Sequence, residues 1–135
     1  MKTITVRASG KYDVLIGKGL LEKVGELALG VKKPCMAAVI SDDTVFSHYG
    51  DIVTDSLQIA GYRVVFYVFP HGESSKIADS YIGILEFLAQ SGVTRGDMIV
   101  ALGGGVTGDL AGFAAATYLR GIPFLQIPTT FLASI

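Results

Sequence analysis

Polar and apolar residues alternate near the start of the chain, and the period of this pattern then changes. Residues 4–6 and 12–16 place every second side chain on an apolar face, as in half-buried strands, with a turn at Ser9-Gly10-Lys11 between them. Beyond residue 20 the apolar positions fall at helical spacing, and Gly30 follows them, where a helix can end. The pattern predicts a β-hairpin followed by a helix.

Short apolar runs and longer amphipathic segments take turns through the rest of the chain. The runs, which suit strands covered on both faces, are residues 36–40, 63–69, 98–102 and 123–127. The segments after the first three runs have helical periodicity, and polar residues that can cap a helix precede two of them, at Asp42-Asp43 and at Ser74 or Ser75. This order predicts an α/β domain with a mainly parallel sheet flanked by helices and an N-terminal β-hairpin.

A glycine-rich segment follows the third of these runs. ALGGGVTGDLAG, residues 101–112, satisfies G-x-G-x-x-G through Gly103, Gly105 and Gly108. Such glycines let backbone N–H groups approach a phosphate, and the helix that follows adds its positive end. A standard dinucleotide fingerprint also expects an acidic residue about 20 positions later, but no acidic residue follows Asp109. The segment is therefore either a pyrophosphate loop of another kind or a tight turn in which glycine allows close packing.

Three polar loops directly follow predicted strands, at Asp42, at residues 71–76 and at residues 103–109. Because ligands of parallel sheets bind outside the carboxyl ends of the strands, we expect these loops to share one rim and to form a ligand site.

Each candidate residue at this rim also has a structural interpretation. Asp42 is either a helix cap or a ligand of ribose hydroxyls. Glu73 and Lys76 form either a surface pair or contacts to ribose and phosphate. Asp109, expected in the first turn of its helix, either interacts with the helix dipole or accepts hydrogen bonds from a ligand. Arg120 is either a solvated turn residue or an anion contact.

Composition narrows the classes of function. The chain has 135 residues, one domain's worth, and a net charge of −1, which offers no footprint for nucleic acid or an anionic membrane. Cys35 is the single cysteine, and His48 and His71 are too few for a metal site. The longest apolar stretch is too short to span a bilayer, and we expect a cytoplasmic protein. From Leu110 onward the only charge is Arg120, so we expect this apolar end to be covered, either within the domain or by the rest of a longer protein.

The motifs PHGESSK, SDDTV and GGGVTGDLAGFAAATYLRGIPFLQIPTT together resemble the amino-terminal, nucleotide-binding domain of the 3-dehydroquinate synthase family, which is Rossmann-like. The longest of them separates this family from the glycerol and iron-dependent alcohol dehydrogenases. The resemblance implies a homodimeric enzyme of the shikimate pathway that uses NAD and a divalent metal, zinc or cobalt. That enzyme converts a sugar phosphate, 3-deoxy-arabino-heptulosonate 7-phosphate, into 3-dehydroquinate and phosphate.

The resemblance also assigns residues. It implies that Asp42 contacts the adenosine ribose and that Arg120 meets substrate across the dimer interface. The remaining cofactor contacts that it implies are His71, Gly72, Glu73, Ser74, Ser75, Lys76, Gly104, Gly105, Val106, Thr107, Gly108, Asp109, Thr129 and Thr130. His71 stands where the family often has an aspartate or another residue.

The family's later motif D-S-S-V-G-G-K and its metal ligands, a glutamate and two histidines in a helical second domain, are absent from this sequence. We therefore expect residues 1–135 to be a truncated NAD-binding domain with no catalytic or metal-ligating residue, inactive alone and binding NAD at most. Two alternatives stay open. The parent could be a sister sugar-phosphate cyclase such as 2-deoxy-scyllo-inosose synthase, or the chain could be a non-catalytic module for folding or dimerisation.

Overall fold

The computed structural model describes residues 2–7, 11–16, 18–71 and 77–129. The elements run, in chain order, β1 (Lys2–Arg7), β2 (Lys11–Ile16), η1 (Lys18–Lys23), α1 (Val24–Leu29), β3 (Met36–Asp42), α2 (Asp43–Ile59), β4 (Arg63–Phe69), α3 (Ile77–Gln90), β5 (Met98–Gly103), α4 (Gly105–Thr117), η3 (Tyr118–Arg120) and β6 (Phe124–Pro128). None of the helices in these ranges is long and apolar enough to cross a membrane.

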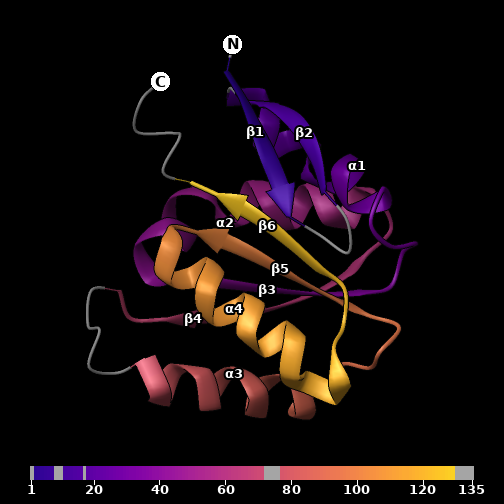
Figure 1. Ribbon diagram of the computed structural model, residues 1–135. Helices are drawn as coiled ribbons and strands as arrows, with labels where there is room; N and C mark the ends of the chain where they lie inside the picture. Colours follow the sequence, from indigo (N-terminus) through magenta and orange to yellow (C-terminus); the bar gives the residue numbers. More distant parts are fainter. Residues whose placement is uncertain (1, 8–10, 17, 72–76, 130–135) are drawn as a thin grey trace.

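Four strands form a parallel sheet in the order β4-β3-β5-β6, and β1 and β2 form a separate antiparallel pair (Figure 1). The predicted Rossmann-like α/β fold with an N-terminal hairpin is thus confirmed. Chain order reverses between β3 and β5, because β4 lies on one side of β3 while β5 and β6 lie on the other. In sheets of this kind the crevice outside the carboxyl ends of the two central strands is the usual place for a ligand.

Helices cover both faces of the sheet, with α1 and α2 on one face and α3 and α4 on the other (Figure 1). Side chains of β3 alternate between the two layers, so that Val39 packs with α2 whereas Ile40 packs with α3 and α4. Both side chains are fully buried. A strand buried on both faces is apolar at most positions, which is why β3 and β5 contain continuous apolar runs. Ser41 is a buried polar residue of β3, and its hydroxyl donates to the Leu102 carbonyl at 2.7 Å.

Asp97 holds the amino ends of β3 and β5 together. Its Oδ1 accepts a hydrogen bond from the Met36 backbone N–H at 2.9 Å, and its Oδ2 accepts from the N–H and the hydroxyl of Thr94 at 2.7 and 3.0 Å. Burial of the carboxylate acts to raise its pKa, but these hydrogen bonds outweigh burial and the pKa of Asp97 is lowered. The charged carboxylate therefore stabilises this end of the sheet.

The return from α4 to β6 is a strained turn at the same amino end. Leu119 and Arg120 have φ angles of 48° and 68°, which are uncommon for residues other than glycine. Gly121 follows with φ 111°, and the Tyr118 hydroxyl donates to the Val93 carbonyl at 2.8 Å. The hydrogen bond thus ties Tyr118, at the start of this turn, to the segment between α3 and β5.

Candidate functional site

The carboxyl ends of the three strands β3, β4 and β5 form one rim. Asp42 pairs with Phe69 in the sheet register, and Ser41 pairs with Leu102. Asp42, His71 and the glycine loop therefore lie at the same edge of the sheet, as the sequence predicts. Gly72, Glu73, Ser74, Ser75, Lys76 and Thr130 lie outside the described residues, and their assigned roles stay predictions.

The amino end of α2 is closed by the chain itself. Asp42 has extended backbone angles, and its Oδ1 accepts a hydrogen bond from the Val45 N–H at 2.7 Å. The interpretation of Asp42 as a helix cap is thus confirmed. Its assigned role at a ribose remains a prediction.

The amino end of α4 differs, because its cap residue is Gly104 and no side chain of a described residue hydrogen-bonds to this end. The first N–H groups of a helix have no partner within the helix and carry its partial positive charge. Gly105, the first residue of α4, is exposed, and a Cβ added there would meet no atom of the described chain within 4 Å. Packing against the described residues thus gives no reason for glycine at this position.

Two other glycines of the same segment are explained by packing. A Cβ at Gly103 would lie 2.7 Å from Thr107 Oγ1, and one at Gly108 would lie 2.1 Å from Gln126 Nε2. The two interpretations of the glycine loop therefore apply to different residues. Gly103 and Gly108 let α4 pack closely against β5 and β6, whereas Gly105 leaves open space beside free amides.

Asp109 is exposed but does not lie in the first turn of α4, because the helix begins at Gly105. The expectation of a first-turn aspartate beside the helix dipole is wrong, since that effect falls off within one turn. Asp109 instead lines a pocket of about 210 Å³ together with Val106, Leu110 and Phe113. Leu110 and Phe113 were missed from sequence, although their spacing from Val106 is that of one helix face.

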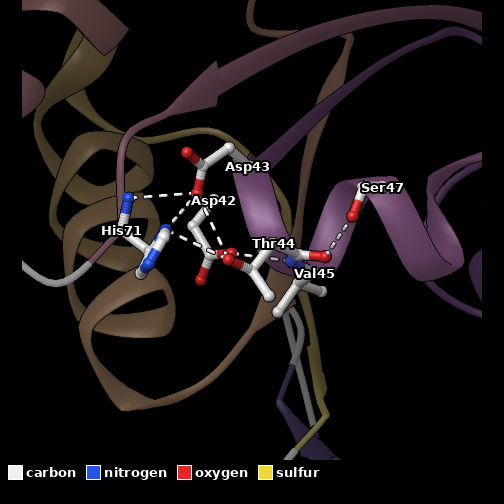
Figure 2. A network of polar contacts seen from close by, with 6 residues as sticks. All are labelled: Asp42, Asp43, Thr44, Val45, Ser47 and His71. Carbon is white, nitrogen blue, oxygen red and sulfur yellow. Dashed lines mark hydrogen bonds and ion pairs between the residues drawn. The ribbon is translucent and has the colours of Figure 1, made fainter.

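His71 contacts the start of α2 (Figure 2). Its Nδ1 lies 2.5 Å from Asp43 Oδ1 and 3.0 Å from Thr44 Oγ1, and its backbone N–H donates to the same Asp43 oxygen at 3.2 Å. The hydrogen bond between the side chains raises the pKa of His71 and lowers the pKa of Asp43. Both side chains are more than half exposed, so the pair contributes little to stability. From the sequence Asp43 is expected only as a possible helix cap, and no role is expected for Thr44.

Two further predicted residues lie at different ends of the sheet. Thr129 is buried at the rim, where its N–H donates to the Gly103 carbonyl at 3.0 Å. Arg120 is exposed at the opposite end, beyond the 13 residues of α4 and hence about 20 Å along the helix from Gly105. Arg120 therefore cannot reach a ligand at the rim of its own chain.

The residues that the structure describes include no group of three or more histidine, cysteine, aspartate or glutamate side chains that could hold a metal ion. The donor set of a metal site is thus not found among them, whereas the uncapped helix at the switch point suits an anionic ligand.

A parallel sheet with helices on both faces and a reversal of chain order between β3 and β5 defines a Rossmann-like α/β protein. The family described as 3-dehydroquinate synthase N-terminal matches residues 66–135. The chain belongs to this family.

Curated relatives agree with this assignment. The chain is 49% identical over 124 residues to 3-dehydroquinate synthase of Streptococcus suis, which covers 92% of this chain and 35% of the relative. It is 43% identical over its full length to the enzyme of Enterococcus faecalis, of which it spans 38%. The chain thus spans little more than a third of the relatives that it matches.

Solved structures of sugar-phosphate cyclases share the fold. The structure of 2-deoxy-scyllo-inosose synthase complexed with carbaglucose-6-phosphate, NAD⁺ and Co²⁺ matches with a TM-score of 0.80 and 30% identity, over 98% of this chain and 36% of that one. The 2-epi-5-epi-valiolone synthase of Streptomyces hygroscopicus, with NAD⁺ and Zn²⁺ bound, matches with a TM-score of 0.73 and 30% identity, over 92% and 34%. Glycerol dehydrogenase of Schizosaccharomyces pombe, with a TM-score of 0.60 at 24% identity over 80% of this chain and 26% of that one, shares the fold alone.

Proposed function

We propose that the chain is the NAD-binding portion of a 3-dehydroquinate synthase, which converts 3-deoxy-arabino-heptulosonate 7-phosphate into 3-dehydroquinate and phosphate. Its identity to enzymes of that name is 43% and 49%, whereas its identity to the two sister cyclases of known structure is 30%. This difference favours 3-dehydroquinate synthase over 2-deoxy-scyllo-inosose synthase as the parent activity.

The observation that carries the NAD assignment is the open space at Gly105. A ligand phosphate can come as close to the amides of Gly105 and Val106 as a hydrogen bond requires, because no side chain of the described residues lies beside Gly105. The dinucleotide pyrophosphate is an anion of the right kind for this helix end. When bound, NAD supplies a hydride acceptor, and the protein supplies its position and its electrostatic surroundings.

Two carboxylates can orient the sugars of the cofactor. Asp42 uses one carboxylate oxygen to cap α2, which leaves its second oxygen to accept from ribose hydroxyls. Asp109 lines the pocket beside Val106 and is available to a hydroxyl or an amide on the other side of the glycine loop. The family resemblance likewise implies that Asp42 contacts the adenosine ribose and that Asp109 contacts the cofactor.

Arg120 serves a second copy of the chain in this proposal. Its position about 20 Å from Gly105 along α4 prevents it from meeting a ligand of its own chain. Arg120 is exposed, so its side chain is accessible to a neighbouring subunit. We therefore propose a homodimer in which Arg120 reaches the sugar phosphate of its partner.

Binding of NAD to the chain, measured by calorimetry, tests the cofactor assignment. We expect Gly105→Ala to weaken NAD at least about tenfold, or about 1.4 kcal/mol, and to leave the free energy of unfolding unchanged or slightly higher, since alanine is the better helix former. Gly96→Ala is the matched control, because a Cβ there meets only Thr94 Oγ1 at 3.6 Å, at the amino end of the sheet.

The outcomes separate the alternatives. Unchanged NAD affinity in Gly105→Ala would show that the pyrophosphate does not bind at the amino end of α4. Absence of NAD binding in a folded, dimeric wild-type chain would support a folding or dimerisation module instead. We expect no phosphate release from the sugar phosphate substrate by this chain alone, and such release would contradict its proposed role as a cofactor-binding portion.

A further inference from the structure

A single carboxylate oxygen fixes the imidazole of His71. Asp43 Oδ1 lies 2.5 Å from the ring Nδ1 and also accepts the backbone N–H of the same histidine at 3.2 Å. Thr44 Oγ1 lies 3.0 Å from Nδ1 and 3.5 Å from Asp43 Oδ1. Backbone and ring of His71 are thus held by one element, the first turn of α2.

These contacts determine which ring nitrogen carries the proton. An ionised carboxylate can only accept hydrogen bonds, so Nδ1 must be protonated. The other nitrogen, Nε2, has no hydrogen-bond partner among the described residues, and it points away from Asp43 (Figure 2). In a neutral ring Nε2 therefore presents a lone pair, and in a charged ring it presents an N–H.

We propose that Asp43 is a positioning residue, which holds His71 so that Nε2–H donates to an anionic oxygen of the bound dinucleotide when the ring is charged and repels it when the ring is neutral. The inference rests on the proposed function, because it takes the pyrophosphate of NAD as the anion at this rim. It adds a pH-dependent contact to the pH-independent amides of α4.

The charges around His71 favour the donating form. Among the described residues, the hydrogen bond and charge of Asp43 raise the pKa of His71, and the charge of Asp42 raises it further. Both carboxylates lie where β3 passes into α2. More of the ring is thus protonated near neutral pH than in an isolated histidine, whose pKa is about 6.5.

Affinity for NAD as a function of pH tests the proposal. We expect the wild-type affinity to fall about three- to tenfold between about pH 5.5 and about pH 8.5, as a charge-assisted hydrogen bond is lost. In His71→Gln we expect weak binding that no longer depends on pH. In Asp43→Asn we expect the fall to occur at a lower pH, since the amide keeps the shape of the carboxylate without its charge. His48→Gln, on the exposed surface of α2, should behave as the wild type.

NMR titration of the histidine ring signals gives a second measurement. A purely structural role of Asp43 would not change the titration of the His71 ring. The chain has two histidines, so His48→Gln and His71→Gln assign both ring signals. Asp43→Asn should lower the titration midpoint of the His71 ring and leave that of His48 unchanged. Sulfate, which keeps its charge over this pH range, should shift the His71 signal only while the ring is protonated.

The results separate this inference from the proposed function. NAD binding that is independent of pH, or identical pH profiles for wild type and Asp43→Asn, would overturn the inference and leave the cofactor assignment intact. Response of the His71 ring to sulfate without any binding of NAD would overturn the cofactor assignment and support the inference for anions in general. Response to neither would overturn both.

Discussion

The two ends of the parallel sheet satisfy their polar groups in different ways. At the amino end the Asp97 carboxylate accepts three hydrogen bonds from Met36 and Thr94, so donors and acceptor are matched within the chain. At the carboxyl end α4 begins with glycine, and no described side chain caps its free amides. Polar groups that are hydrogen-bonded within the chain stabilise the fold. Backbone groups of a helix end that lack such partners are available to bind a ligand.

The same contrast exists within the carboxyl end, between the two helices that begin there. Asp42 caps α2 from within the chain, whereas Gly104 leaves α4 open. Two helices that start at the same rim thus have different roles. The capped helix carries side chains such as Asp43, and the uncapped helix offers its backbone.

The largest effect is expected at the amino end. Asp97→Ala leaves the N–H groups of Met36 and Thr94 without their acceptor and should lower the free energy of unfolding by about 2 kcal/mol. Urea unfolding measures the loss, and NAD affinity of the folded variant should be unchanged. Asp97→Asn keeps an acceptor oxygen and should lose less. Weakened NAD binding in Asp97→Ala would mean that the two ends are not independent.

A smaller effect is expected at the carboxyl end. Asp42→Ala removes the cap of α2 and should cost about 1 kcal/mol in unfolding free energy. Asp42→Ser restores a capping oxygen without the carboxylate, so stability should return while NAD affinity stays reduced. Recovery of both properties in Asp42→Ser would show that Asp42 is a cap and not a ribose contact.

The smallest effect concerns pH. Because the pKa of Asp97 is lowered in the folded protein, its contribution to stability is present above the unfolded pKa of about 3.9 and is lost as pH falls through the lower folded value. The wild type should therefore lose more unfolding free energy than Asp97→Asn when pH falls from about 5 to about 3. Equal losses of unfolding free energy, measured by urea unfolding over this pH range, would contradict a stabilising role of the charged Asp97 carboxylate.

Much of the fold could be predicted from the sequence because apolar runs and glycines bound its elements. The run Arg63–Phe69 is β4 to the residue, and Gly30 follows α1 as expected. The start of α4 is harder to predict from the sequence, because glycine is a poor helix former and a helix that begins with glycine lacks the usual signal. Asp109 is therefore expected in the first turn of α4, whereas the helix starts at Gly105 and Asp109 lies in its second turn.

The site was predicted less completely, since it depends on contacts between distant segments. Asp43 and His71 are 28 positions apart, and nothing in their local sequence pairs them. The different roles of Gly105 and Gly108 depend on Gln126, which β6 brings against α4. A sequence pattern can thus identify a glycine loop without telling which glycine serves the ligand.

The place of Arg120 has a consequence for how binding responds to dilution. Because Arg120 lies at the far end of α4, it can contact a ligand at the rim only when two chains associate. If a second copy supplies this guanidinium, affinity for a phosphorylated sugar is a property of the pair and not of the chain. The affinity for a phosphorylated sugar then falls as the protein is diluted, whereas the binding that the α4 amides and Asp42 provide does not depend on protein concentration. In the proposed dimer, one part of the site therefore belongs to a single chain, and the part that contains Arg120 comes from the partner.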